Sequence, residues 1–129
     1  MAGFSPVGLQ LRDFEPFRDV LRASIRYAGA VRIDHILGLN RLYVVPKGKG
    51  ADEGTYIKMP FQALLSVLAL ESNRSSCIVI GEDLGTVPDG FREKLVDWGI
   101  WSYRVMMFER EYDGAFLQPL SLSQTLSGW

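Results

Sequence analysis

Two acidic residues that follow short apolar runs are the residues of this sequence best placed to do chemistry. Asp34 follows the run 30–33, and Glu82 follows the run 77–81. Runs of Val and Ile without a polar face are typical of strands buried on both faces, as in parallel sheets. A charged side chain directly after such a strand costs desolvation energy, so it is expected either to be paired or to have a function. Because working residues in α/β barrels and open α/β sheets lie at the carboxyl ends of strands, we expect both acids at such an end.

The surroundings of the two acids favour glycoside chemistry. Period-two alternation places Arg32 on the same face as Asp34, and a guanidinium favours the ionised form of a neighbouring carboxyl group. Glu82 follows apolar residues and Gly81, and dry surroundings favour a protonated carboxyl group. Glycoside cleavage uses one ionised and one protonated carboxyl group. Retaining enzymes hold these two groups about 5–5.5 Å apart. The alternative interpretation makes each acid a loop cap or half of an ion pair.

Other kinds of site are weaker interpretations. Four residues at the two strand ends could suggest a metal site: Asp34, His35, Glu82 and Asp83. Their spacing is not that of zinc ligands. The glycine-rich stretch 47–55 matches neither the P-loop nor the dinucleotide pattern, so we expect a mobile surface loop where a substrate could be covered. Three aromatic residues could stack on sugar rings, although aromatic residues on strands are usually core: Tyr43, Trp101 and Phe108.

Helices and strands alternate along the chain and must position the two acids. Apolar periodicity and terminal signals predict helices over 14–28, 60–76 and 86–99, and strands over 30–34, 77–81 and 103–108. A short extended segment is expected over 41–45, whereas 1–13 and 109–129 show no period and are expected to be irregular. This alternation predicts βαβ units and a parallel sheet.

The composition is that of one small globular domain. The 129 residues are 47% hydrophobic and 22% charged, and a net charge of −1 gives no electrostatic case for binding nucleic acid or an anionic membrane. One cysteine excludes a disulfide framework. No apolar run approaches the roughly 20 residues of a membrane helix, and the first ten residues lack the features of a signal peptide. We therefore expect a soluble, cytoplasmic protein.

Residues 14–110 resemble the middle of the 4-α-glucanotransferases, the amylomaltase or disproportionating-enzyme family (glycoside hydrolase family 77). The resemblance rests on RIDH at 32–35, on EDLG at 82–85, and on the longer runs FRDVLRASIRYAGAVRIDHILGL and ALESNRSSCIVIGEDLGTVPDGFREKL. It implies an α/β fold that is part of a (β/α)8 barrel, about strands 4 to 6. Residues 1–129 would then be one segment of the catalytic barrel, with an irregular tail over 111–129.

The resemblance also implies roles for individual residues. Asp34 matches the catalytic nucleophile, which forms a covalent glucosyl-enzyme intermediate, and Glu82 matches the general acid/base. Four residues match substrate-binding positions: Arg32, which holds the nucleophile, His35, Asp83 and Phe108. The implied reaction moves a segment of an α-1,4-glucan to the 4-hydroxyl of glucose or another glucan, by retaining double displacement. Maltooligosaccharides and other α-1,4-glucans are the implied partners, and no cofactor or metal is implied.

The sequence departs from the family in one catalytic feature. A third carboxylate is expected in a Thr-His-Asp motif, and we do not find that motif in the sequence. The stretch 121–129, particularly 125–126 and 128–129, resembles the family's residues after the motif, and the last acid of the chain, Asp113, does not match it. We therefore expect a truncated enzyme. The alternatives are an inactive remnant that at most binds maltooligosaccharides, and a small structural or partner-binding α/β module with vestigial carboxylates.

Overall fold

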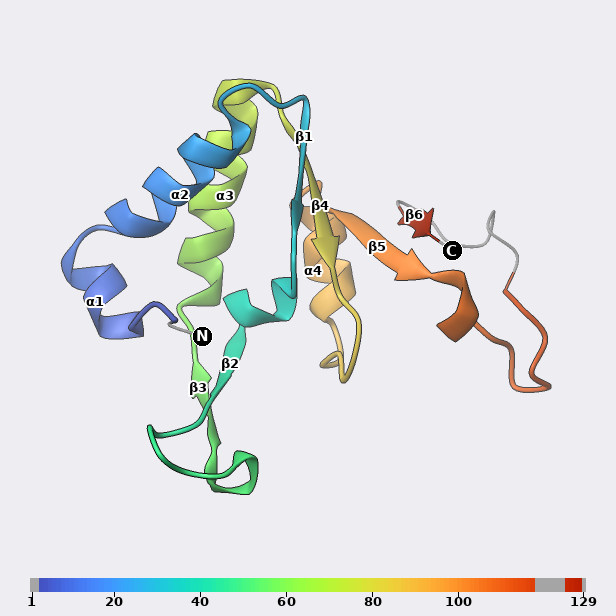
Figure 1. Cartoon of the computed structure of the whole chain (residues 1–129). Coiled ribbons are helices and arrows are strands. Elements are labelled where there is room, and N and C mark those ends of the chain that lie inside the picture. Colours follow the sequence, from blue (N-terminus) through green and yellow to red (C-terminus); the bar gives the residue numbers. More distant parts are fainter. Residues whose placement is uncertain (1–2, 118–124, 129) are drawn as a thin grey trace.

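A four-stranded parallel sheet forms the centre of the structure, a computed structural model that describes residues 3–117 and 125–128 (Figure 1). In spatial order its strands are β1 (Ala30–Ile33), β4 (Ile78–Glu82), β5 (Trp101–Val105) and β6 (Thr125–Gly128). A separate antiparallel hairpin consists of β2 (Arg41–Val44) and β3 (Thr55–Lys58). Figure 1 shows this hairpin beyond the carboxyl ends of β1 and β4. The parallel sheet with intervening helices confirms the predicted α/β class.

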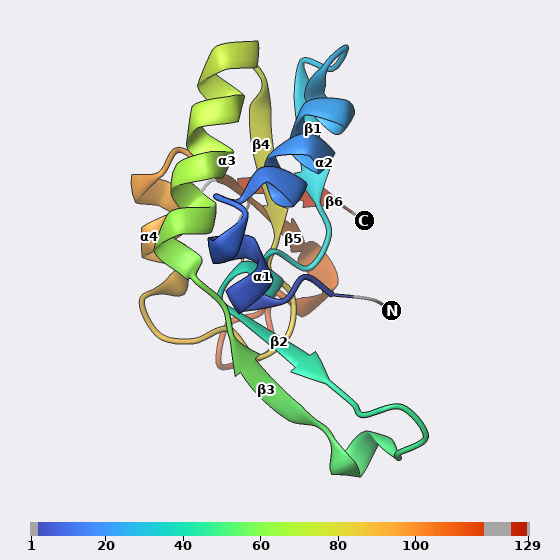
Figure 2. The same cartoon turned by 90° about the vertical axis from the view of Figure 1, so that its left-hand side faces the viewer.

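The helices of the described residues surround one face of this sheet: α1 (Pro6–Leu11), α2 (Glu15–Ile25), α3 (Phe61–Ser75) and α4 (Phe91–Asp97). Helix α2 buries Phe17, Leu21 and Ile25, which recur every four residues and therefore form one apolar stripe. Figure 2 shows α2 and α3 side by side in front of β1 and β4. The shared core includes Leu64, Leu65 and Leu68 of α3 together with Phe91 and Leu95 of α4.

Strand register decides which side chains face the helices. Val31 pairs with Val79 and Ile33 pairs with Gly81, and these positions lie on the helix side of the sheet. A Cβ atom on Gly81 would lie 2.6 Å from Cδ1 of Ile36, so the glycine permits close approach of the 3₁₀ turn Ile36–Leu39. The alternate positions, which include Arg32, form the face without helices.

Several expected boundaries were wrong. Residues 6–11 form α1, whose amino end is capped by Ser5 Oγ accepting from the Gly8 N–H at 3.2 Å, although 1–13 was expected to be irregular. Helix α4 begins at Phe91 instead of residue 86, after a loop in which Gly90 has φ +73°. Strand β5 starts at Trp101 and ends at Val105, and 106–108 is a 3₁₀ turn.

Two strands were not anticipated. The stretch 55–58 forms β3, and 125–128 form β6, which pairs in parallel with β5 in the region expected to be an irregular tail. The loop between β2 and β3 is exposed, as expected for a surface loop, and contains a short 3₁₀ turn, Ala51–Glu53. Its expected mobility stays a prediction.

Candidate active site

The structure brings Asp34 and Glu82 to the same edge of the sheet. Strands β1 and β4 are parallel and their register runs through the pair Ile33 and Gly81, so Asp34 and Glu82 are the next residues of the two strands. Neighbouring strands lie about 4.8 Å apart, which is the scale of a two-carboxylate site. This arrangement is the one predicted from the two apolar runs.

Asp34 is an exposed acid paired with Arg32. The side chain of Asp34 is 80% exposed, and its Oδ1 atom lies 2.8 Å from Arg32 Nη2. The Arg32 guanidinium also lies over the ring of Tyr103 on β5, 5.1 Å from its centre. The predicted alternation along β1 is thus confirmed, and Arg32 is braced by an aromatic ring two strands away.

Glu82 has contrasting surroundings. It is only 9% exposed, and both of its carboxylate oxygens accept main-chain hydrogen bonds. The N–H of His35 donates to Oε2 at 2.7 Å, and the N–H of Leu84 donates to Oε1 at 3.0 Å. The two donors hold the carboxylate from both sides, one from the end of β1 and one from its own strand end.

His35 contributes to this contact through its main chain. Its backbone lies in the left-handed region, with φ +51° and ψ 58°, and its side chain is exposed. Its N–H, directly after Asp34, is the group that donates to Glu82. Because the donor is a main-chain group, no pattern of side chains in the sequence could reveal it.

The remaining two predicted site residues lie in different surroundings. The Asp83 side chain is fully buried and its Oδ2 atom accepts from Arg92 Nε at 2.7 Å. Phe108 belongs to the 3₁₀ turn that follows β5 and is 66% exposed. Phe108 is therefore available to a ligand, whereas the Asp83 carboxylate is buried and one of its oxygens is bound by Arg92. The proposed sugar contacts of both residues stay predictions.

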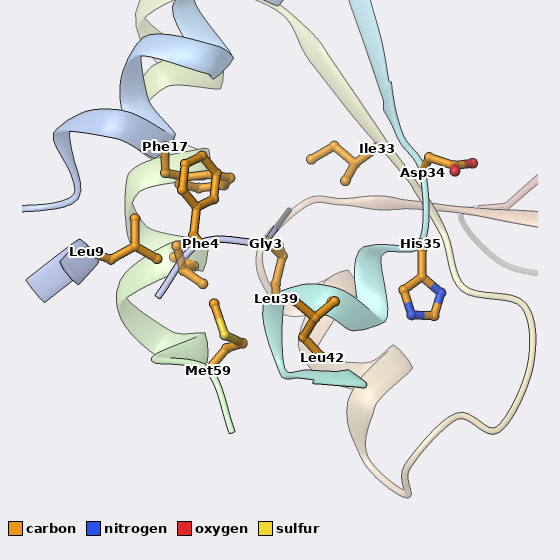
Figure 3. Close-up of a pocket in the computed structure, with 12 residues that line it drawn as sticks. Gly3, Phe4, Leu9, Phe17, Ile33, Asp34, His35, Leu39, Leu42 and Met59 are labelled. Atoms are coloured by element: carbon orange, nitrogen blue, oxygen red, sulfur yellow. The ribbon is translucent and has the colours of Figure 1, made fainter. Parts of the chain in front are cut away.

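A cavity of about 420 Å³ adjoins the site on the helix side of β1. Its lining is largely apolar and includes Phe4, Leu9, Phe17, Leu42 and Met59. Figure 3 shows the Ile33 side chain directed toward these residues and the Asp34 carboxylate directed the opposite way. Asp34 and His35 also belong to the lining of this cavity. Because the Asp34 carboxylate points away from the apolar residues, the side of β1 with the carboxylate is the better candidate for a polar ligand.

The base of the hairpin also approaches the site. A smaller cavity of about 90 Å³ is lined by His35 together with Arg41, Tyr56 and Thr86. Arg41 donates from Nη2 to the carbonyl oxygen of Thr86 at 3.1 Å, and its guanidinium lies 4.6 Å from the centre of the Tyr56 ring. Sequence reasoning missed these hairpin residues because Tyr56 lies in a strand that no periodicity indicated.

The described residues contain neither a group of metal ligands nor a helix that could cross a membrane. Within residues 3–117 and 125–128, no group of three or more His, Cys, Asp or Glu side chains could hold a metal ion. None of the helices described there is long and apolar enough to cross a membrane.

The fold and the site define a class of protein. It is an α/β protein with two carboxylates, one exposed and paired with arginine, the other buried and held by main-chain donors, at adjacent parallel strand ends. The model of glycoside hydrolase family 77, described as 4-alpha-glucanotransferase, matches residues 1–126. The chain belongs to this family.

Individual relatives agree with this assignment. A 4-alpha-glucanotransferase from Haemophilus influenzae is 50% identical over 105 residues, which are 81% of this chain and 15% of that protein. One from Mycobacterium bovis is 41% identical over 108 residues, which are 84% of this chain and 15% of the relative. The crystal structure of amylomaltase from Corynebacterium glutamicum has a TM-score of 0.84 at 34% identity, over 95% of this chain and 18% of that one. The chain thus spans about 15% of the length of the first two relatives.

Proposed function

We propose that this chain carries the nucleophile and the general acid/base of a 4-alpha-glucanotransferase, on about strands 4 to 6 of a (β/α)8 barrel. The observation that supports this most is the placement of Asp34 and Glu82 as the next residues after a paired stretch of two parallel strands. Family membership and the likeness to amylomaltase support it further. The substrates in this proposal are α-1,4-glucans, with glucose or another glucan as acceptor.

The proposed reaction has two steps at one anomeric carbon. In the first, Asp34 attacks this carbon and forms a glucosyl ester, while Glu82 gives its proton to the glycosidic oxygen of the leaving sugar as the old bond breaks. In the second, the Glu82 carboxylate takes the proton of the acceptor 4-hydroxyl, whose oxygen displaces Asp34. Two inversions give net retention.

The neighbours of the acids suit these roles. Arg32, paired with Asp34 and stacked on Tyr103, keeps the nucleophile oriented. His35 and Phe108 are exposed beside the site and are the proposed sugar contacts. We find no Thr-His-Asp motif in the sequence, and we therefore propose that this chain needs a third acid from elsewhere for full turnover. We also propose a cytoplasmic location, consistent with a single, free and buried Cys77.

Trapping of the covalent intermediate tests the nucleophile directly. We would incubate the 129-residue chain and its Glu82→Gln variant with α-maltosyl fluoride, whose leaving group needs little acid assistance, and measure intact mass. The expected result is a maltosyl adduct on Asp34 that persists in Glu82→Gln and is absent in Asp34→Asn. Asp97→Asn, at the far end of α4, is the matched control and should keep the adduct.

The same samples separate the alternatives. Saturable binding of maltotriose without any adduct would favour the inactive, glucan-binding remnant. Neither adduct nor binding would contradict both the enzyme and the remnant, and would leave the structural module.

A further inference from the structure

We propose that Arg92 is a positioning residue for Glu82 and acts through Asp83 and the main chain of Leu84. The inference rests on the proposed function, because it gives Arg92 a part in the geometry of the general acid/base. It also gives Asp83 a different role from the sugar contact implied by the family resemblance.

The first step is the dependence of Asp83 on Arg92. Asp83 is fully buried, and its Oδ2 atom lies 2.7 Å from Arg92 Nε. Arg92 Nη2 also makes a longer contact of 3.5 Å with the main-chain oxygen of Asp83. The other carboxylate oxygen, Oδ1, is buried and has no hydrogen-bond partner among the described residues. A buried carboxylate with a single charged partner is strongly destabilised when that partner is removed.

The second step leads from Asp83 to Glu82. Asp83 lies between Glu82 and Leu84 in the chain, and the Leu84 N–H donates to Glu82 Oε1 at 3.0 Å. Arg92 contacts both the side chain and the main-chain oxygen of Asp83, so it holds the Asp83–Leu84 peptide, which carries this donor. The chain then turns at Gly85, with φ +102°, and no strand pairing among the described residues supports the segment beyond Glu82. The orientation of the Leu84 N–H therefore depends on the Asp83–Arg92 pair.

The third step is the packing of the helix that carries Arg92. Its neighbour Phe91 is buried and stacks on Phe61 of α3, with ring centres 5.3 Å apart and planes 15° apart. Leu95, one turn further along α4, is also buried in the shared core. Arg92 thus connects the packed core between α3 and α4 to the end of β4, where Glu82 lies.

Two amide protons make this proposal measurable without turnover. The N–H groups of His35 and Leu84 each bind one oxygen of Glu82, so both proton chemical shifts should follow the ionisation of this carboxyl group. We would record them by NMR over a pH series in the 129-residue chain. Glu82→Gln should abolish both responses, which assigns them to Glu82.

Arg92→Gln is the decisive variant. We expect the pH response of the Leu84 amide to fall by more than half, because its peptide is no longer held, and the response of the His35 amide to persist, because β1 supplies that donor. Arg92→Lys, which keeps the charge, should restore part of the Leu84 response. Arg22→Gln removes a comparable contact with a buried acid, Glu71, between α2 and α3, and should leave both responses unchanged.

Other outcomes would overturn the proposal. An unchanged Leu84 response in Arg92→Gln, or an equal loss in Arg22→Gln, would reduce Arg92 to a structural ion pair. If Arg92→Gln does not fold because it leaves a buried charge, the double variant Asp83→Asn/Arg92→Gln removes that charge and should still lose the Leu84 response. Because the NMR measurement needs no sugar, its result and that of the covalent trapping are independent.

Discussion

Position 35 combines an unfavourable backbone conformation with a useful hydrogen bond. The left-handed region costs a residue with a side chain about 1–2 kcal/mol, and His35 occupies it at φ +51°. The surrounding structure maintains this conformation, since the His35 N–H reaches the buried Glu82 carboxylate. Strain of this kind is characteristic of functional sites, where it holds a group in place before a ligand arrives.

Glycine at this position should relieve the strain and keep the donor. We expect His35→Gly to change the free energy of unfolding by less than about 1 kcal/mol, because relief of strain offsets the greater backbone entropy of the unfolded glycine. We expect His35→Val to destabilise by at least about 1 kcal/mol, since a β-branched side chain tolerates this region poorly. Urea unfolding followed by tryptophan fluorescence measures both. If valine were tolerated better than glycine, the backbone argument would be wrong.

At the residue scale, the sequence could predict where the two acids lie, but not the main-chain donors and the arginine that hold Glu82 and Asp83. Asp34, Glu82 and Arg32 could be placed because strand ends and period-two alternation are local properties. The main-chain donors of His35 and Leu84 depend on loop dihedral angles, which no residue pattern encodes. Arg92 is nine residues from Asp83, a separation that belongs to no helix or strand period.

At the scale of elements, an ion pair between the half-exposed Arg22 and the buried Glu71 joins α2 and α3. Glu71 is almost fully buried, and its two oxygens accept from Arg22 Nε at 2.8 Å and Arg22 Nη2 at 3.0 Å. Arg74 adds a contact of 3.2 Å from the same helix. The hydrogen bond from Arg22 lowers the pKa of Glu71 below its ordinary value, an effect stronger than the opposing effect of desolvation. The helix pair is therefore held more tightly when Glu71 is ionised.

This pair should make stability depend on pH in a defined direction. Because the folded-state pKa of Glu71 is lowered, its contribution is present above the ordinary value of 4.5 and is lost as the pH falls through the folded-state value. We expect Glu71→Gln to be less stable than the parent at pH 7, with a difference that shrinks as the pH falls below the ordinary value of 4.5. Thermal unfolding followed by circular dichroism at several pH values measures this.

The matched control is an exposed acid on another helix. Glu93→Gln, on α4, should leave the pH dependence close to that of the parent. Parallel stability curves for the parent and Glu71→Gln would contradict the role of the ion pair.

The elements that could be predicted are those with a strong repeat. Helices α2 and α3 and strands β1 and β4 were located from apolar periodicity and unbroken Val and Ile runs. Strand β3 was not predicted because all four of its residues are exposed. Helix α1 was not predicted because a six-residue helix with an internal glycine has little intrinsic stability. These short elements are defined by tertiary contacts, which a single sequence does not display.

At the scale of the whole molecule, the described part of the sheet has helices on one face only. On its other face Ile78 is 51% exposed, and Trp101 of β5 is also partly exposed. Among the described strands, β1 pairs on one side only, so its outer edge is open. Open edges and exposed apolar faces are features that proteins normally cover. The partial barrel predicted from the sequence would leave these surfaces open in the isolated chain, and this remains part of the proposal.

The isolated chain should therefore self-associate through this face. We expect the sedimentation coefficient to rise with protein concentration, and Ile78→Lys to reduce this rise because it places a charge on the open face. Leu11→Lys, which changes an even more exposed apolar residue on α1, is the matched control and should not reduce it. A concentration-independent coefficient for the parent chain would mean that these surfaces do not drive association.

The parallel pairing of β1 with β4 also sets the order of assembly. Ala30 pairs with Ile78, and the hairpin and α3 both lie between them in the chain. The hairpin and the helices are made by local contacts and can form early, whereas the parallel strands must wait for this long loop to close. During synthesis, the contact between His35 and Glu82 cannot exist until residue 82 has left the ribosome. The two carboxylates would then meet only after the hairpin and α3, which lie between them in the chain, have been made.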